Sequence, residues 1–173
     1  MISQTKWSDR KFTFDFPVGI LPCLIERLRG VPARLEEMTI ELPQDVLISR
    51  TDGGWSIQEH VGHFLDTEEL WQKRLDDYLT GKQILTEADL KHRRTLEANH
   101  NANTLELLLA QFRIERCRLC DRLAQLAETD AARLSIHPRL NKPIRLIDSV
   151  YFTCEHDDHY MAILRSLVQQ SGY

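Results

Sequence analysis

The stretches that decide the fold are WSIQEHVGHFLDTEELW, residues Trp55–Trp71, and EHDDHYMAIL, residues Glu155–Leu164. In both, apolar residues recur at intervals of three and four, the spacing of one face of an α-helix. The first stretch belongs to a periodic segment over residues 56–79, which ends at the helix stop Thr80-Gly81, and the second to a segment over residues 145–170. Both segments therefore predict long amphipathic helices that bury one face in a common core.

Two more periodic segments lie outside these stretches. One covers residues 18–38, where Pro22 and Pro32 interrupt the pattern and the second proline predicts a kink or a break, and the other covers residues 104–127. Four long helices with long crossover connections predict an all-α domain of the four-helix-bundle class. Because 173 residues are enough for one domain with a substantial core, we expect a single domain over residues 1–173.

Composition argues against several other classes of protein. Hydrophobic residues make up 42% and charged residues 28% of the chain, and the net charge is −4 with acids and bases interspersed. The chain has no basic stripe for a nucleic-acid backbone, no apolar run of the roughly 18 residues that span a membrane, and no signal-peptide core. We therefore expect a cytoplasmic protein without nucleic-acid or membrane partners.

The cysteines fit a reducing compartment. Cys117 and Cys120 form a CxxC pair, whereas Cys23 and Cys154 are isolated, so no second CxxC completes a zinc site. Two cysteines one turn apart in a regular helix are poorly placed for a bridge, and we expect no structural disulfide.

Polar side chains interrupt the apolar stripe of the last predicted helix, residues 145–170. Asp157 falls near the middle of the stripe, and His156 and Tyr160 share its flank as an (i, i+4) pair. His159 falls nearly opposite the stripe, where solvent is expected. Helical spacing therefore disfavours His156 and His159 as a chelating pair.

The helix predicted over residues 56–79 carries a second polar set. Glu68 lies near the centre of its apolar face, and His60 lies closer to that face than His63. An unpaired buried carboxylate is costly, so Glu68 and Asp157 need partners or a wetted cavity. Imidazoles and carboxylates on facing bundle helices are also typical metal ligands, and zinc, nickel and iron(II) accept them. Helical phase alone favours His60 over His63 as the ligand.

An ordinary role for the histidines is the alternative to a metal site. A single histidine on a helix is usually a surface or hydrogen-bonded residue, and three on two helices can coincide by chance. His92, His100 and His137 fall in the predicted connections, where we expect each to be structural or exposed.

Taken together, the two opening stretches resemble the DinB superfamily. The resemblance rests on GHFLD at residues 62–66 paired with EHDDH at residues 155–159, and HPRLNKP at residues 137–143 is similar to a subgroup of this family. Helix order and spacing match from about Phe16 to Gly172. The resemblance implies an up-down-down-up four-helix bundle that holds a divalent metal (zinc, nickel or iron) through three side chains, commonly histidines.

By position, the family's ligands correspond to His63, to His156 and to the residue four places after His156. Relatives usually have histidine at this last position, whereas this chain has Tyr160, and a neutral phenol is a poor ligand. Three outcomes stay open. Tyr160 binds the metal as a phenolate, His159 or Glu68 takes its place, or the site holds no metal.

In function, the resemblance implies a metal-dependent enzyme that acts on a small molecule. The expected reaction is thiol S-transfer, with a low-molecular-weight thiol as partner, or hydrolysis. Tyr160 would be a ligand or a general acid, and Asp157 would orient an imidazole. The alternative is a non-catalytic small-molecule-binding or stress-response protein that keeps the pocket but lacks one ligand. A module that works as a homodimer is a third alternative.

Overall fold

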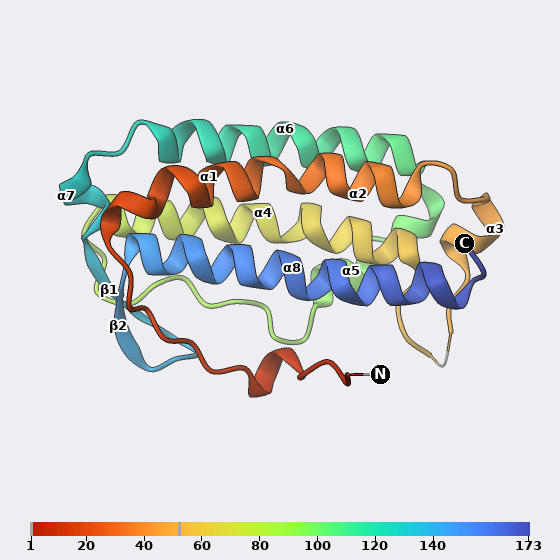
Figure 1. Cartoon of the computed structure of the whole chain (residues 1–173), viewed down its shortest axis with the longest axis horizontal. Coiled ribbons are helices and arrows are strands. Elements are labelled where there is room, and N and C mark those ends of the chain that lie inside the picture. The colour runs from red at the N-terminus through yellow and green to blue at the C-terminus, as the bar shows by residue number, and fades with distance from the viewer. Residues whose placement is uncertain (1, 52) are drawn as a thin grey trace.

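The computed structural model describes residues 2–51 and 53–173. Four helical columns run side by side along the longest axis of the molecule, which is the all-α bundle expected from the sequence (Figure 1). Within the described residues, no helix is long and apolar enough to cross a membrane. The columns are α1 (Leu21–Arg29) continued by α2 (Val31–Thr39), then α4 (Ile57–Leu79), α6 (Leu105–Ala124) and α8 (Leu146–Gln170).

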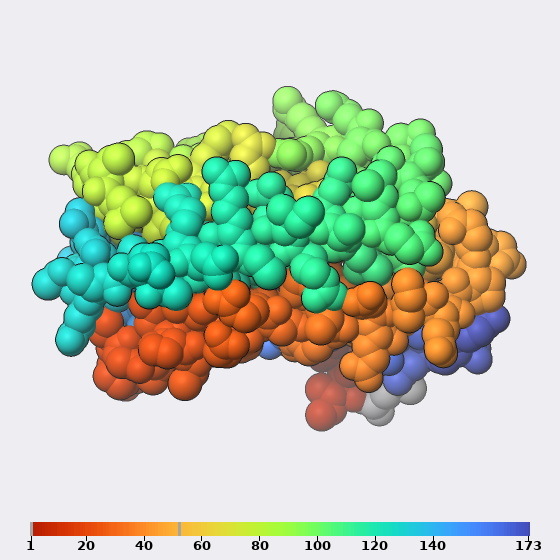
Figure 2. All heavy atoms as spheres, turned by 90° about the horizontal axis from the view of Figure 1, so that it is seen from above, coloured from red at the N-terminus to blue at the C-terminus, as the bar shows by residue number. Residues whose placement is uncertain are grey.

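The helices follow the up-down-down-up order, because α4 and α6 run in the same direction. Both start at the end of the molecule that carries α3 (Gln44–Ile48), while α1–α2 and α8 run toward that end (Figure 1). A long crossover over residues 80–104 joins α4 to α6 and contains α5 (Arg93–Glu97) and a 3₁₀ turn at His100–Ala102. Seen from above, α6 lies between this crossover and α1–α2 (Figure 2).

Local capping sets where α4 and α6 begin. Ser56 and Glu59 form a capping box, in which the Ser56 Oγ accepts the Glu59 N–H at 3.1 Å and the Glu59 carboxylate accepts the Ser56 N–H at 2.8 Å. The Thr104 Oγ1 accepts the Leu107 N–H at 3.2 Å at the start of α6. Gly81, with a φ of 74°, follows the end of α4. Both helix starts lie one residue from the predicted ones.

The first column is broken, as the prolines in the predicted segment 18–38 indicate. The break lies at Gly30, and Pro32 occupies the first turn of α2. Pro22 differs from expectation, because it occupies the first turn of α1 after the 3₁₀ turn Val18–Ile20 and interrupts nothing. In a first turn, the missing N–H of proline costs no hydrogen bond.

A small hairpin and several short helices go beyond the predicted elements. The segment expected as a loop before α8 contains the antiparallel strands β1 (Leu134–His137) and β2 (Lys142–Arg145), preceded by α7 (Glu128–Ala131). Strands of four residues are too short for alternating burial to stand out in a sequence. The hairpin packs beside the N-terminal end of α8 and supplies part of the site described below.

The apolar core is divided into two clusters by a polar layer at mid-bundle. The division falls at Glu68 on α4, at Arg116 on α6 and at Asp157 on α8, with apolar cluster residues before and after each of them. The clusters fix the helices against one another through the burial of apolar surface. The polar layer therefore lies in a rigid frame at the level of the histidines.

All four cysteines are free thiols. Cys117 and Cys120 lie one turn apart on α6, with Cys120 buried and Cys117 half-buried, while Cys154 is buried and Cys23 is exposed. Burial raises the pKa of the Cys120 thiol to about 12, so it stays protonated at neutral pH and is unreactive.

Candidate metal centre

Three side chains predicted for the site meet on the seam between α4 and α8. The ring centroids of His63 and His156 are 5.6 Å apart, and the ring of Tyr160 lies 4.6 Å from His63 and 4.7 Å from His156. All three residues are buried. The (i, i+4) spacing of His156 and Tyr160 places both rings on the side of α8 that faces His63.

His63 is oriented by a relay of hydrogen bonds from the crossover. Its Nδ1 lies 3.1 Å from the Thr95 Oγ1, and Thr95 in turn donates to the Asp66 carboxylate at 2.8 Å. Because the only hydroxyl proton of Thr95 goes to Asp66, His63 donates its Nδ1 proton to Thr95. The opposite nitrogen, Nε2, is buried and has no partner within the described residues.

Burial keeps the His63 imidazole neutral. It lowers the pKa of His63 well below 6.5, and the neighbouring His156 and His92 lower it further. His63 therefore presents an unprotonated Nε2 lone pair at neutral pH, which is the form in which histidine binds metals.

Asp157 lies between His156 and the buried Arg116. The Asp157 Oδ1 is 3.5 Å from the His156 Nδ1, and its Oδ2 accepts the Arg116 Nη1–H at 2.5 Å. Burial alone would raise the pKa of Asp157, but the positive charge of Arg116 outweighs it and keeps that pKa below its usual value. Asp157 thus lies beside the His156 imidazole, where its predicted orienting role requires it, but no hydrogen bond joins the two side chains within the described residues.

Arg116 is the partner that the buried carboxylates need, and the sequence analysis did not identify it. The Glu68 Oε1 accepts from both Nε and Nη2 of Arg116, at 2.9 and 2.5 Å. A signal was present, since position 116 is four residues from Phe112 and from Cys120, two apolar residues of the segment predicted over residues 104–127, and therefore shares their helix face. The guanidinium engages one carboxylate oxygen of Glu68, the substitute ligand considered from the sequence, while the Oε2 has no hydrogen-bond partner among the described residues.

His60, which helical phase favours, lies farther from the cluster. Its ring is 6.1 Å from Tyr160, and burial lowers its pKa to about 4. His63, not His60, lies beside His156. Glu68 and its arginine partner occupy the middle of the apolar face, so the histidines meet on the flank of the helix.

His159 is not exposed to solvent, in contrast to the prediction. The N-terminal segment covers this side of α8, with the Gln4 Nε2 at 3.0 Å from the His159 Nδ1 and the Trp7 ring 5.5 Å from the His159 ring. Only 8% of the surface of His159 is exposed to solvent. The segment before residue 17 was not assigned a position from the sequence, and for this reason the burial of His159 was not foreseen.

His92 lies next to the cluster, although it was expected to be structural or exposed. Its ring centroid is 5.1 Å from that of His63, and the residue is half-buried. The backbone of His92 is left-handed (φ 50°) immediately before α5, a conformation that is uncommon for residues other than glycine. No periodic pattern in the sequence indicates this conformation.

The remaining connection histidines are structural. The His100 Nε2 lies 2.8 Å from the Asp66 carboxylate and thereby steadies the relay to His63. His137 is buried on β1, with its Nε2 at 3.1 Å from the Arg74 Nη1.

A cavity of about 910 Å³ opens beside the cluster. Its walls come from α4 and α8, from the N-terminal segment, from the crossover at residues 86–95 and from the hairpin at residues 137–139. The wall around the cluster consists of His63, His92, His156, Tyr160, Trp7 and Trp71. The volume is within the range of small-molecule sites in proteins.

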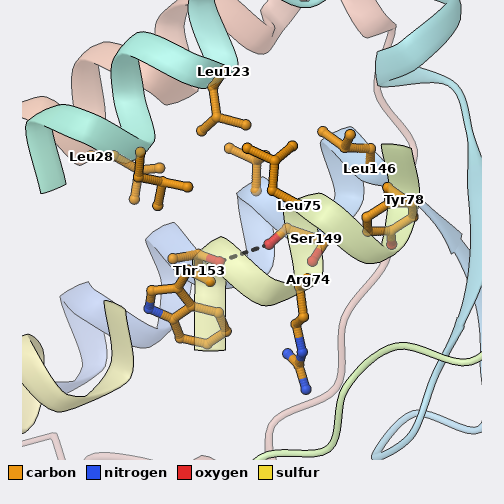
Figure 3. A pocket seen from close by; sticks show the side chains of 11 residues that line it. Leu28, Arg74, Leu75, Tyr78, Leu123, Leu146, Ser149 and Thr153 are labelled. Carbon is orange, nitrogen blue, oxygen red and sulfur yellow. Dashed lines mark hydrogen bonds between the residues drawn. The ribbon is translucent and has the colours of Figure 1, made fainter. Parts of the chain in front are cut away.

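A second cavity, inside the bundle, is much smaller, and its wall is mostly apolar with Arg74, Ser149 and Thr153 as polar members. It measures about 30 Å³ and lies among Leu28, Leu75 and Leu123 (Figure 3). A space of this size is large enough for a water molecule but far smaller than a small-molecule site. Figure 3 also shows Arg74, whose side chain leads away from these leucines toward the crossover.

No ready-made set of three conventional ligands is present. Among residues 2–51 and 53–173, no group of three or more histidine, cysteine, aspartate or glutamate side chains is arranged to hold a metal ion. Burial raises the pKa of the Tyr160 phenol above 10, so Tyr160 is neutral at neutral pH. The cluster therefore offers two imidazoles and one phenol, with a third imidazole, His92, next to His63.

Comparisons with known proteins agree with this architecture. A family model described as the DinB superfamily matches residues 27–164. The solved structure of YfiT from Bacillus subtilis, described as a probable metal-dependent hydrolase with an unusual four-helix bundle topology, is 22% identical with a TM-score of 0.82 over 95% of this chain and 94% of that chain. A mycothiol-dependent maleylpyruvate isomerase is 9% identical with a TM-score of 0.65 over 84% of this chain and 62% of that one. The curated proteins gave no match.

Proposed function

This chain belongs to the DinB superfamily, and from that premise we propose that it is a divalent-metal-dependent enzyme that acts on a small molecule by hydrolysis or thiol S-transfer. Hydrolysis is supported by the likeness to YfiT, described as a probable metal-dependent hydrolase. A low-molecular-weight thiol as co-substrate is supported by the likeness to a mycothiol-dependent isomerase. Cytoplasmic location and a homodimer remain predictions.

The observation that carries the proposal is the unpartnered Nε2 of His63. A buried polar atom without a partner costs free energy, and proteins keep such atoms mainly where they have a use. Here the relay through Thr95 fixes the tautomer, so that the free nitrogen is a lone-pair donor. The ring of His156 lies at 5.6 Å, close enough for both imidazoles to bind one ion.

His63 and His156 are the proposed ligands, and the third donor comes from Tyr160 or His92. Tyr160 occupies the sequence position at which relatives have their third ligand, but its phenol is neutral at neutral pH. His92 has the better donor atom, since burial and the charge of His156 both lower its pKa and keep it neutral. We therefore propose His92 as the third nitrogen donor, which requires its ring to move toward His63 and His156, because the three histidines are not arranged to hold an ion in the described residues. Tyr160 is then the proposed proton donor.

A divalent ion bound here supplies a Lewis acid that makes a water molecule or a thiol acidic enough to serve as a nucleophile near neutral pH. Asp157 orients His156, and Thr95 orients His63. Tyr160, with its proton retained, is placed to give that proton to a leaving group. The rings of Trp7 and Trp71 each pack against His156, with centroid distances of 5.4 Å, and give the cluster an aromatic wall.

One observation favours a second candidate, a non-catalytic small-molecule-binding protein. Tyr160 occupies the position where relatives have a ligand, and the part of the chain that the structure describes contains no converged three-ligand set. In that case the cavity binds its small molecule without an ion.

Metal analysis and calorimetric titration separate the two candidates. Protein purified without an affinity tag is titrated with Zn²⁺, Ni²⁺ and Fe²⁺ at neutral pH. The enzyme proposal expects about one ion per chain, lost in His63→Ala and in His156→Ala because each removes one of the two fixed imidazoles. His159→Ala is the matched control and leaves binding unchanged, since Gln4 and Trp7 already occupy that ring. Wild-type protein that binds none of the three ions contradicts the enzyme proposal and favours the binding protein.

A further inference from the structure

Two arginines on the cavity wall lack an acidic partner. Within residues 2–51 and 53–173, Arg74 and Arg139 are the arginines that are not exposed and yet form no ion pair with a carboxylate, and both line the 910 Å³ cavity. A buried cation without a counter-charge is costly, because its desolvation is not compensated. Their positions therefore call for an explanation.

Arg74 is fixed in place by neutral groups alone. The residue is 97% buried (3% exposed); its Nε donates to the Thr86 carbonyl at 3.0 Å and its Nη1 donates to the His137 Nε2 at 3.1 Å. The guanidinium lies 5.5 Å from the centroid of Trp71. Burial lowers the pKa of Arg74 to about 10, as expected for a cation short of negative charge. No hydrogen bond engages its Nη2 group among the described residues, and the Arg74 side chain lines the cavity.

Arg139, in the turn of the hairpin, is in a similar position. Its Nη2 donates to the Trp7 carbonyl, while its Nη1 is buried and has no partner in the described chain. Its guanidinium lies 4.8 Å from the ring of Trp7 and 5.6 Å from that of Phe152. Burial and the nearby Arg10 lower its pKa. Arg139 thus has an N–H donor that needs an acceptor.

Both guanidinium groups are one aromatic ring away from the proposed metal ligand His156. Trp71 separates Arg74 from His156, and Trp7 separates Arg139 from His156, with each indole 5.4 Å from the imidazole. The two arginines share the hairpin side of the cavity. Arg74 donates a hydrogen bond to His137, and the His137 ring lies 4.7 Å from the ring of Phe152. The guanidinium of Arg139 lies 5.6 Å from the same Phe152 ring.

The acidic side chains of the cavity are already engaged elsewhere. Asp66 is bound by His100, Thr95 and Arg94, and Glu69 is paired with Lys73 and Arg94. Asp89 accepts backbone N–H groups at the start of α5, and Glu87 is exposed at the rim. No carboxylate in residues 2–51 or 53–173 forms an ion pair with either arginine.

We propose that Arg74 and Arg139 bind the oxyanion group, a carboxylate or a phosphate, of the small-molecule substrate, and that the aromatic walls receive its apolar part. Guanidinium N–H groups match the paired oxygens of both anions. The inference that the bound anion orients the substrate, with its reacting bond beside His156, rests on the proposed function. Binding of the anion itself depends on the two arginines alone.

Ligand titrations of the full chain, as purified and again after treatment with a chelator, test this. The probes are benzoate, phenyl phosphate and the neutral benzamide, which shares the shape of benzoate without its charge. Binding is followed by calorimetry and by the indole signals of Trp7 and Trp71 in NMR spectra. At least one of the two anions binds about tenfold or more tightly than benzamide, and the better one identifies carboxylate or phosphate as the preferred group.

Variants assign the binding to the arginines. Arg74→Gln and Arg139→Gln each weaken anion binding about tenfold and leave benzamide unchanged. Arg122→Gln is the matched control, because Arg122 is paired with Gln72 and Asp76 outside the cavity. Arg139 is half-buried in a turn, so we expect Arg139→Gln to fold. Arg139→Gln therefore still tests anion binding if Arg74→Gln does not fold.

Failure of this inference differs from failure of the proposed function. Equal binding of benzoate and benzamide, unchanged affinity in Arg139→Gln, or no binding of any probe overturns it. Anion binding that persists in chelator-treated protein and in His63→Ala supports it even where no metal binds. Anion binding that is lost with the metal, while Arg139→Gln keeps full affinity, assigns the anion to the ion and overturns the role of the arginines.

Discussion

Tyr160 is the residue at which this site departs from the family pattern. Replacement Tyr160→His adds a neutral nitrogen donor four residues after His156, on the face that meets His63. We expect affinity for Zn²⁺ or Ni²⁺ to rise by about tenfold or more. Melting temperature in added metal should rise with it, since an ion that binds only the folded state stabilises it by mass action. Calorimetric titration and melting curves measure both.

The phenylalanine variant of Tyr160 is the control for this experiment. Tyr160→Phe removes the hydroxyl and keeps the ring, so with a neutral phenol in the wild type it should leave metal affinity unchanged. Tight binding by the wild type at neutral pH that disappears in Tyr160→Phe contradicts our assignment and makes the phenolate a ligand.

Thr95 acts on the site through His63 rather than by touching an ion. Thr95→Val keeps the shape of the side chain but removes the hydroxyl that accepts from the His63 Nδ1 at 3.1 Å. The imidazole then loses its fixed tautomer, and metal affinity should fall about 10- to 100-fold, as for other residues that orient ligands. Calorimetric titration measures the fall. Thr67→Val is the matched control on the same cavity, because the Thr67 hydroxyl donates to the Phe64 carbonyl of its own helix; an equal fall in both variants argues against the relay.

At the scale of elements, α4 and the crossover approach each other at Gly62. A Cβ at this position would lie 2.3 Å from the His100 ring, well inside van der Waals contact. Gly62→Ala gains about 1 kcal/mol of helix propensity, but the clash displaces the 3₁₀ turn that carries His100 and costs about 1–3 kcal/mol. We expect the urea midpoint to fall. Gly19→Ala, with nothing within 4 Å of the added Cβ, should have no comparable effect, and a stabilised Gly62→Ala shows that the crossover moves away freely.

Helices could be predicted from the sequence because their signals are local. Ser56 and Thr104 predict the starts of α4 and α6, and Gly81 follows the end of α4. The periodic apolar stripes span many turns, so small phase errors do not change the assignment of a helix. The hairpin and α5 are only four or five residues long, and their positions depend on tertiary contacts.

The site could be predicted only in part, because phase along a helix is less certain than helix existence. Periodicity favoured His60, and the family resemblance was needed to favour His63, the histidine that lies beside His156. His92 and His159 were placed wrongly or not at all, since one depends on a left-handed backbone and the other on a distant N-terminal segment. The ligand roles of His63, His156 and His92 are proposals that the metal titrations test.

At the scale of the whole molecule, the polar layer links folding stability to pH. Arg116 faces two carboxylates with one positive charge, so burial prevails at Glu68 and raises its pKa from 4.5 to about 7. A group whose pKa is higher in the folded state contributes stability below its unfolded pKa and loses it as pH rises through the folded value. The contribution of Glu68 to the free energy of unfolding should therefore fall as the pH rises from about 4.5 to 7.

Urea unfolding of Glu68→Gln and wild type at pH 5 and pH 8 tests this. The amide keeps the size of the side chain but does not titrate, so the variant should gain stability relative to wild type on going to pH 8, by up to a few kcal/mol. Contributions from the buried histidines are common to both proteins and cancel in the difference. A difference that is the same at both pH values means that Glu68 is already ionised at pH 5 in the folded protein.

The walls of the large cavity and the histidine pair come from different parts of the chain. His63 and His156 belong to α4 and α8, which are packed into the core, whereas the N-terminal segment, the crossover and the hairpin turn supply much of the rest of the wall. Such connecting segments accept insertions and exchanges far more readily than packed helices do. Selection can thus alter which compound is recognised without disturbing the imidazoles. For the engineer, transplanting the crossover and hairpin turn of one bundle onto the helices of another is a direct way to exchange specificities.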